Sequence, residues 1–293
     1  MTFGIVANLG KQKAREAIPT FLGLLAEKGI PAVVTTSIRR ELDIEAFNPS
    51  DYHRSEIGFH CDIVIAFGGD GTMLSTAREV SHTQVPILGV NLGRFGFLAE
   101  ISIKELYEQV EKIASGNYEV ETRMALEARV FHGAKERTFF ACNDVVLDRY
   151  SSSRTILIDT YIDGEYLNTY NADGIIISSP TGSTAYNLSA GGPLLATDLE
   201  ALIVTPICSH SLSQRPLVIN PRRTIKIKAR SEGRKMLFTA DGQDVLDVTE
   251  KDVIEVRKSR YPVKLVKFSG KSFYQVLRTK LNWGENKCSN ESI

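Results

Sequence analysis

The first third of the chain alternates short apolar runs with segments of helical periodicity. Four runs rich in β-branched residues predict buried strands at residues 3–7, 32–35, 62–67 and 85–90. Apolar side chains that recur every three or four positions predict amphipathic helices at residues 14–28, 73–80 and 104–115. Strands that are apolar throughout and are separated by helices are typical of a parallel sheet covered on both faces. We therefore expect an N-terminal α/β domain.

From about residue 118 the pattern changes from helical to alternating, and it stays alternating to about residue 268. Residues 155–162 and 165–170 flank an Asp163-Gly164 pair and predict a β-hairpin. Further alternating segments predict strands at residues 224–229, 234–239, 252–257 and 263–268. The pattern therefore predicts a second, mostly-β domain.

The last periodic segment, residues 272–281, predicts a C-terminal helix with one apolar face. A β-rich domain offers this helix no helix-covered sheet, so we expect it to pack back on the first domain. The predicted domains are residues 1–118 together with 270–293, and residues 119–269.

Composition places the chain among ordinary globular proteins. It has 293 residues, of which 43% are hydrophobic and 24% charged, so it is long enough for about two domains and is neither disordered nor collagen-like. Lysines and arginines number 35, as do aspartates and glutamates. Because a protein that binds nucleic acid normally shows a basic excess, we expect no such partner.

Cysteine spacing and hydropathy bear on metal sites and location. The four cysteines lie far apart, with no CxxC pair and no histidine at metal-ligand spacing, so we expect no zinc site. No window approaches the roughly 18 to 20 apolar residues of a membrane span, and the N-terminus lacks the pattern of a signal peptide. We expect a cytoplasmic protein with reduced thiols and no membrane partner.

The segment AFGGDGT, residues 66–72, carries the clearest chemical signal. Its glycines follow a predicted parallel strand and precede a helix, an arrangement that lets backbone amides approach a phosphate closely. Asp70 is unusual there, because a carboxylate among phosphates is unfavourable unless it binds a bridging metal ion or accepts a proton from a hydroxyl. The alternative is a tight turn in which Asp70 only caps the helix.

Other nucleotide-binding and hydrolase motifs fail on spacing. Leu265 stands where a P-loop ending at Gly270-Lys271-Ser272 needs glycine. No GxGxxG follows a predicted strand, and no GxSxG occurs. GGDGT is therefore the candidate phosphate-binding motif of this sequence.

A second stretch, residues 171–195, reads NADGIIISSPTGSTAYNLSAGGPLL and is rich in small and hydroxylated residues. Its exposed backbone groups, hydroxyls and single ring, Tyr186, suit a ligand that carries a ring, an amide and sugar hydroxyls. The alternative is a surface loop, although loops of that length are uncommon without a function. Asn143-Asp144 and Asp241-Gly242-Gln243 are ambiguous alone and are each compatible with a bulge or turn.

Taken together and in order, five motifs resemble the NAD kinase family, which makes NADP by phosphorylating the 2′-hydroxyl of the adenosine ribose of NAD. They are GGDGT at 68–72, GVNLGRFGFL at 89–98, Asn-Asp at 143–144, ADGIIISSPTGSTAYNLSAGGP at 172–193 and DGQ at 241–243. GGDG alone is shared with lipid kinases, whereas the long second stretch singles out NAD kinases. The resemblance covers nearly the whole chain and implies an α/β domain, a β-rich domain, a site between them, and a homodimer or homotetramer.

The resemblance also implies roles for individual residues. Asp70 would be the general base, Asn143 and Asp144 would hold the adenosine half of NAD, and Tyr186 would be a stacking surface. The phosphates of donor and acceptor would lie near Gly68, Gly69, Gly71 and Thr72. The nicotinamide and adenine pocket would be lined by Asp173, Thr184, Ala185, Tyr186, Asn187, Leu188 and Ser189, with further contacts from Arg154 and Gln243.

The expected substrates are NAD and ATP, with a divalent cation, Mg²⁺, that arrives with ATP and has no dedicated protein ligands. Asn171 stands where the family commonly has a basic residue, which leaves the choice between NAD and NADH open. The choice of phosphoryl donor among ATP, other triphosphates and polyphosphate also stays open.

Two other functions stay open on the residues alone. One is a lipid or sugar kinase that shares the GGDG loop, which would have no use for the TAYNLS segment. The other is an NAD or NADP sensor without turnover, which would not need Asp70.

Overall fold

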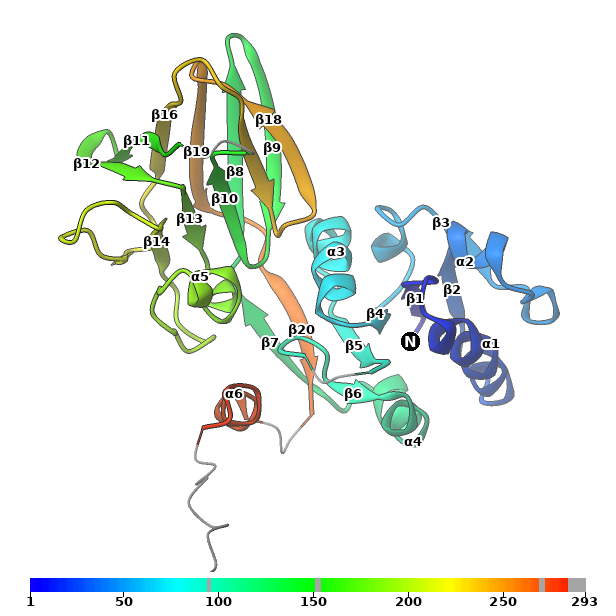
Figure 1. Cartoon of the computed structure of the whole chain (residues 1–293). Coiled ribbons are helices and arrows are strands. Elements are labelled where there is room, and N and C mark those ends of the chain that lie inside the picture. The colour runs from blue at the N-terminus through cyan, green and yellow to red at the C-terminus, as the bar shows by residue number, and fades with distance from the viewer. Residues whose placement is uncertain (94–95, 151–153, 269–271, 284–293) are drawn as a thin grey trace, which may run out of the picture.

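The computed structural model describes residues 1–93, 96–150, 154–268 and 272–283. Figure 1 shows them as two lobes, one built of strands and helices and the other almost entirely of strands. The predicted fold class, an N-terminal α/β part followed by a mostly-β part, is confirmed.

Eight strands form the sheet of the first lobe, in the order β3-β2-β1-β4-β5-β20-β7, with β6 paired to β5. Neighbouring strands are parallel except β20 and β7, which are antiparallel. The strands are β1 (Phe3–Ala7), β2 (Ala32–Thr35), β3 (Ser50–Tyr52), β4 (Ile63–Gly68), β5 (Ile87–Asn91), β6 (Ile101–Ser102), β7 (Glu119–Arg123) and β20 (Val263–Lys267).

Helices cover this sheet on both faces. Ile65 of β4 packs in one cluster with Phe21 of α1 and Val110 of α4, whereas its neighbour Val64 packs with Met73 of α3 in another. Successive residues of a strand point to opposite faces, so the two clusters lie on opposite sides of the sheet. The helices are α1 (Gln12–Glu27), α2 (Thr36–Glu41), α3 (Asp70–Val80) and α4 (Ile103–Ala114), with short 3₁₀ turns at Glu45–Phe47, Ile57–Phe59 and Ser81–Thr83.

The second lobe is a sandwich of two six-stranded antiparallel sheets. Val145 and Ile177 from one sheet share a buried cluster with Ala128 and Ile158 from the other, so the two inner faces form one core. One sheet contains β10 (Asp144–Asp148), β13 (Gly174–Ser178), β14 (Leu202–Ile207), β15 (Leu217–Ile219), β17 (Met236–Ala240) and β18 (Asp244–Val248). The other contains β8 (Leu126–His132), β9 (Lys135–Ala141), β11 (Ile156–Ile162), β12 (Glu165–Ala172), β16 (Ile225–Arg230) and β19 (Asp252–Lys258).

Two strands differ from the predicted domain boundaries. β7 and β20 were expected in the second domain, but they close one edge of the first sheet, where Leu265 pairs with Ile87 of β5. The alternating pattern of residues 263–268 shows that one face of a strand is buried but carries no information about which sheet the strand joins. The rest of the predicted division stays a prediction.

The C-terminal helix α6 (Phe273–Leu281) begins with a capping box between Ser272 and Gln275. It lies beside the first sheet, as predicted, because Ser272 and Gln275 line a cavity together with Glu121 of β7 and Lys267 of β20. Within the described part of the chain, none of the helices combines the length and the apolar character that crossing a membrane requires.

The order of the strands indicates where on this sheet a ligand would bind. β2 and β3 extend the sheet to one side of β1, and β4 and β5 extend it to the other. Ligands of open α/β sheets bind at the carboxyl ends of the strands where the order reverses in this way. In this chain those ends are Ala7 of β1 and Gly68 of β4, and GGDGT begins at the second of them.

Candidate functional site

The GGDGT segment joins β4 to α3. Gly68 ends β4, Gly69 is the N-cap of α3, and Asp70 is its first helical residue. A Cβ added at Gly68 would lie 2.1 Å from the Thr72 hydroxyl oxygen, so no larger residue fits without displacing the first turn of the helix. The loop is compact because it contains glycine at this position.

Asp70 does not cap the helix. Its Oδ2 accepts a hydrogen bond from the Phe97 amide at 2.9 Å, and its Oδ1 accepts one from the Leu98 amide at 3.0 Å. The N-cap of α3 makes no side-chain hydrogen bond. The alternative that Asp70 only closes a tight turn is therefore wrong, because its carboxylate is held by a loop that follows a different strand.

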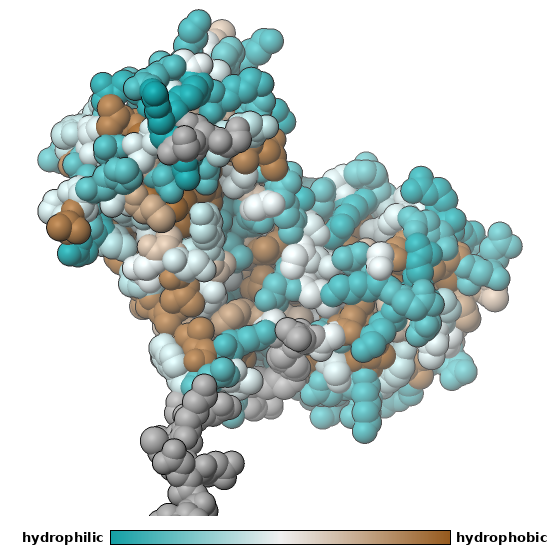
Figure 2. All heavy atoms as spheres, viewed as in Figure 1, coloured by the Kyte–Doolittle hydropathy of each residue, from teal (hydrophilic) through white to brown (hydrophobic). Residues whose placement is uncertain are grey.

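A cavity of about 930 Å³ opens in front of Asp70. It is lined by residues that follow β1, by the first turn of α3, and by Gln243 from the second lobe. Figure 2 shows a notch in the surface between the two lobes, beside the position of α3 in Figure 1. We call this space the Asp70 cavity.

Three cations line the Asp70 cavity, and sequence reasoning did not find them: Lys11, Arg15 and Arg54. Lys11 follows β1, and a Cβ added at Gly69 would lie 3.5 Å from its Nζ, so its ammonium group lies beside the glycine loop. Neither Lys11 nor Arg54 belongs to a motif recognised in the sequence. No local pattern joins cations so far apart in the chain.

Arg54 is held by α3. Its guanidinium donates to the hydroxyls of Ser75 and Thr76 at 2.7 and 2.9 Å. Burial lowers the pKa of Arg54, and the Glu79 carboxylate opposes this effect. Arg15 is partly neutralised because it pairs with Glu41 at 2.7 Å. The excess positive charge of the cavity suits a chain of phosphates.

A second cavity, of about 320 Å³, lies in the sandwich lobe. Asn143, Asp144 and Tyr186 line it, together with the Asp241-Gly242 turn. We call it the Tyr186 cavity. The Tyr186 ring is 42% exposed and is available to a ligand. The cavity brings together three of the motifs that the sequence placed about 40 to 100 residues apart.

Asp241 organises one wall of this cavity. Its carboxylate accepts hydrogen bonds from the amides of Cys142, Asn143 and Asp144, at 2.8, 2.7 and 3.2 Å. It lies in a turn with φ of 52° at Asp241 and 62° at Gly242, which joins β17 to β18, so of the two structures compatible with this segment the turn is observed. Burial, followed by the negative charge of Asp241, raises the pKa of Asp144 to about 7.

Residues 171–195 are more ordered than the surface loop that stood as the alternative, and they include strand β13. They also contain a 3₁₀ turn at Thr181–Thr184 and a short helix, α5 (Tyr186–Ser189). Asn187 has no exposed surface, and its amide bonds Ser183, Pro193 and Thr205. Its side chain therefore holds the segment together, and a contact between Asn187 and the ligand stays a prediction.

One of the remaining predicted members of this segment lines the Tyr186 cavity. Ala185 lines it directly. Thr184, Leu188 and Ser189 lie on the same two short turns, partly or fully exposed, and their contact with a ligand stays a prediction.

Gln243 connects the two lobes. Its Nε2 donates to the backbone oxygen of Gly71 at 2.9 Å, and its Oε1 accepts from Arg78 of α3 at 3.3 Å. Arg78 also pairs with Asp244 at 3.4 Å. The DGQ motif therefore contributes to both cavities, with Asp241 in one and Gln243 in the other.

Arg154, Asn171 and Asp173 are among the predicted residues that lie outside both cavity linings. Arg154 has a side chain 73% exposed and pairs with Glu232, and Asn171 is exposed on β12. Asp173 pairs with Arg149 at 2.9 Å and is near Tyr186, since burial and the charges of Asp148 and Asp173 raise the pKa of that phenol. Only Asp173 is therefore close to the cavities.

Comparison with known families agrees with these features. Residues 3–118 match the ATP-NAD kinase N-terminal domain, and residues 142–268 match the ATP-NAD kinase C-terminal domain. The chain is 39% identical to an NAD kinase of Moorella thermoacetica, over 99% of this chain and 92% of that protein. It is 40% identical to an NAD kinase of Syntrophotalea carbinolica, over 96% of this chain and 98% of that protein.

Solved structures show the same architecture. Yeast NADH kinase, solved in complex with NADH, superimposes with a TM-score of 0.87 at 29% identity, covering 98% of this chain and 89% of the yeast chain. An NAD kinase from Archaeoglobus fulgidus, solved in complex with ATP, has a TM-score of 0.74 at 24% identity, covering 96% of this chain and 99% of that chain, and shares the fold. With both domain models and full-length relatives in agreement, the chain belongs to the NAD kinase family.

Proposed function

We propose that the chain transfers the γ-phosphoryl group of ATP to the 2′-hydroxyl of the adenosine ribose of NAD, with Asp70 as the general base. The observation that carries this proposal is the position of Asp70. It lies at the switch point of the sheet, in a cavity with three cations, and the DGQ turn links this cavity to the Tyr186 cavity.

The Tyr186 cavity is the proposed acceptor side. An aromatic ring offers a stacking surface for a base, and Asn143 and Asp144 offer hydrogen-bonding groups for the adenosine. Asp241 fixes the backbone of both residues, so these groups are in place before NAD binds. A preorganised pocket binds with less loss of conformational entropy.

The Asp70 cavity is the proposed donor side. Lys11 and Arg54 would hold the triphosphate, and the amides of the GGDGT loop at the start of α3 would approach its oxygens. In the reaction the 2′-hydroxyl loses its proton to the Asp70 carboxylate as its oxygen bonds the γ-phosphorus. The bond between that phosphorus and the β,γ-bridging oxygen breaks, and ADP leaves with the electron pair.

A divalent cation, Mg²⁺, is proposed to arrive with the donor. Among the described residues no group of three or more His, Cys, Asp or Glu side chains is placed to hold a metal ion. Mg²⁺ keeps several waters and binds substrate phosphates, so the triphosphate would hold it and Asp70 would stay free to accept the proton. When bound, the cation would neutralise charge on the phosphate oxygens.

Assembly and location are further parts of the proposal. We propose a cytoplasmic homodimer or homotetramer without nucleic-acid or membrane partners, and the balanced charge of the chain supports the absence of nucleic acid. Light scattering on the purified protein, with and without NAD, measures the number of subunits. A monomer under both conditions would contradict the proposed assembly.

The reaction is tested by an end-point assay of the purified protein with NAD, ATP and Mg²⁺, in which an NADP-specific dehydrogenase detects the product. Asp70→Asn is run in parallel, with NAD binding by calorimetry and circular dichroism as controls for its fold. We expect NADP from the wild type and a rate lower by about 10²- to 10⁴-fold for the variant, the range that a positioned base contributes. Wild-type turnover by Asp70→Asn would remove Asp70 from the mechanism.

The same assay measures substrate choice. Replacing NAD by NADH, and ATP by other triphosphates or polyphosphate, identifies the preferred acceptor and donor. If NAD binds but none of the donors yields NADP, the chain is a sensor rather than a kinase.

A further inference from the structure

The carboxylate of Asp70 is held by the GVNLGRFGFL segment, residues 89–98, to which the sequence assigned no role. The Phe97 and Leu98 amides, which donate to its two oxygens, belong to the loop that follows β5, whereas Asp70 follows β4. A carboxylate offers about four acceptor positions, so two of them are used by the loop and two are left for other donors. The loop fixes the side chain without blocking it.

Gly96, immediately before these amides, lies against the Asp70 carboxylate. A Cβ added at Gly96 would lie 1.9 Å from Asp70 Oδ1 and 2.5 Å from Oδ2, far inside van der Waals contact. Gly96 is not among the described glycines with positive φ, so space and not backbone conformation requires glycine here. Gly93 of the same loop has no atom within 4 Å of an added Cβ.

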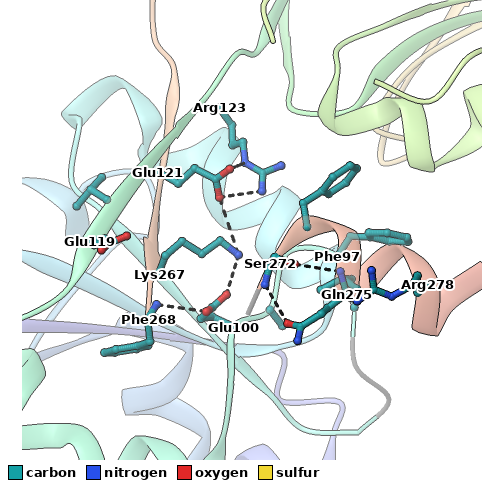
Figure 3. Close-up of a pocket in the computed structure, with 15 residues that line it drawn as sticks. Phe97, Glu100, Glu119, Glu121, Arg123, Lys267, Phe268, Ser272, Gln275 and Arg278 are labelled. Carbon is teal, nitrogen blue, oxygen red and sulfur yellow. Dashed lines mark hydrogen bonds and ion pairs between the residues drawn. The ribbon is translucent and has the colours of Figure 1, made fainter. Parts of the chain in front are cut away.

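The other end of the loop is tied to the edge of the sheet. Glu100 is 3% exposed, accepts from Lys267 at 2.7 Å, and accepts from the Phe268 amide at 3.3 Å. Figure 3 shows this network on one side of the cavity, and Phe97, which lines the same cavity, lies on the side of α6. A buried carboxylate with a paired cation resists displacement, because separating the pair would leave buried charge uncompensated. Glu100 therefore keeps the loop close to Asp70.

We propose that Gly96 is a positioning residue, which lets the Phe97 and Leu98 amides clamp the Asp70 carboxylate in its reactive orientation, and that Glu100 anchors this clamp. The inference rests on the proposed role of Asp70 as base. Phosphoryl transfer depends on alignment more than on covalent help, so a displaced base lowers the rate of the chemical step.

The test compares Gly96→Ala with Gly93→Ala, which adds the same methyl group to the same loop where there is room for it. We expect Gly96→Ala to lower kcat about 100-fold, while KM for NAD and ATP changes by less than about threefold. Gly93→Ala should keep kcat within about twofold of the wild type. Equal kcat values for the two variants would overturn the proposal.

A double-mutant cycle separates positioning from general damage. In the Asp70→Asn background the base is already absent, so adding Gly96→Ala should lower the residual rate by less than about threefold. A merely structural role predicts the same loss in both backgrounds, and that result would overturn the proposal. If the wild type makes no NADP at all, the proposed function fails instead.

Circular dichroism and NAD binding by calorimetry verify that Gly96→Ala is folded. Should it not fold, Glu100→Gln tests the anchor, since glutamine keeps an acceptor for Phe268 but loses the ion pair with Lys267. We expect kcat to fall several-fold with KM unchanged. An unchanged kcat for this variant would contradict the anchored clamp.

Discussion

Asp241 holds the backbone of Asn143 from a hairpin turn 98 residues further along the chain, accepting its amide hydrogen at 2.7 Å. The same carboxylate binds the amides of Cys142 and Asp144, so one side chain shapes the backbone where β9 meets β10. It is buried, with 9% of its surface exposed. The Asn-Asp motif is therefore positioned by the DGQ motif.

Asp241→Asn tests this relationship. The amide side chain keeps one acceptor oxygen but brings an N–H group against a backbone donor, which leaves buried polar groups unpaired. We expect the free energy of unfolding to fall by about 1–3 kcal/mol, measured by urea denaturation, and NAD to bind more weakly.

Asp247→Asn is the matched control for this change, because Asp247 lies on the following strand and pairs with Lys235 on the surface. We expect its urea midpoint to match that of the wild type. If the two variants shift the midpoint equally, the three amide contacts of Asp241 do not stabilise the fold as argued.

The role of Asp241 also shows what the sequence could predict. The strands and helices were visible because burial leaves a local pattern in residues 3–7 or 14–28, and GGDGT was visible because its glycines are contiguous. Asp241 looked like an ordinary turn residue, since its partners lie about 100 residues away. Lys11, Arg54 and the placement of β20 were missed for the same reason, because tertiary proximity leaves no trace in local spacing.

A pH dependence of stability follows from the burial of Asp144. Its pKa is raised to about 7 in the folded protein, whereas the pKa of an aspartate in an unfolded chain is about 3.9. At pH values between these two pKa values, the Asp144 carboxyl group is protonated in the folded state and ionised in the unfolded state. This group therefore stabilises the fold at low pH, and its contribution is lost as the pH rises from about 4 to about 7.

Asp144→Asn removes this titration, because the amide stays neutral at every pH. Compared with the wild type, we expect the variant to gain on the order of 1 to 3 kcal/mol of unfolding free energy at pH 8 and nothing near pH 4. Urea denaturation of both proteins at the two pH values measures the difference. A difference independent of pH would contradict the buried titration.

Lys11 offers a test of the donor side. Lys11→Met keeps most of the length of the side chain but removes a charge from the Asp70 cavity. We expect KM for ATP to rise about 10-fold, the loss typical of one charge-assisted hydrogen bond, while calorimetry shows unchanged NAD binding. Lys13→Met is the control, since Lys13 is exposed on α1 and does not line the cavity. An equal rise in KM for Lys13→Met would show that positive charge anywhere on this part of α1 affects ATP binding, and not Lys11 in the cavity specifically.

Tyr186 tests the acceptor side, because its ring is the aromatic surface of the second cavity. Stacking of a base on an aromatic side chain contributes about 1–3 kcal/mol, so Tyr186→Ala should raise the Kd for NAD about 10-fold or more. The turnover rate at saturating NAD should change much less, since the ring does not touch the transferred phosphoryl group in this assignment. Tyr166→Ala removes another exposed tyrosine ring, which packs on Tyr161 and lines neither cavity, and should leave the Kd unchanged. An unchanged Kd for Tyr186→Ala together with a large fall in turnover would move Tyr186 from substrate binding to the chemical step.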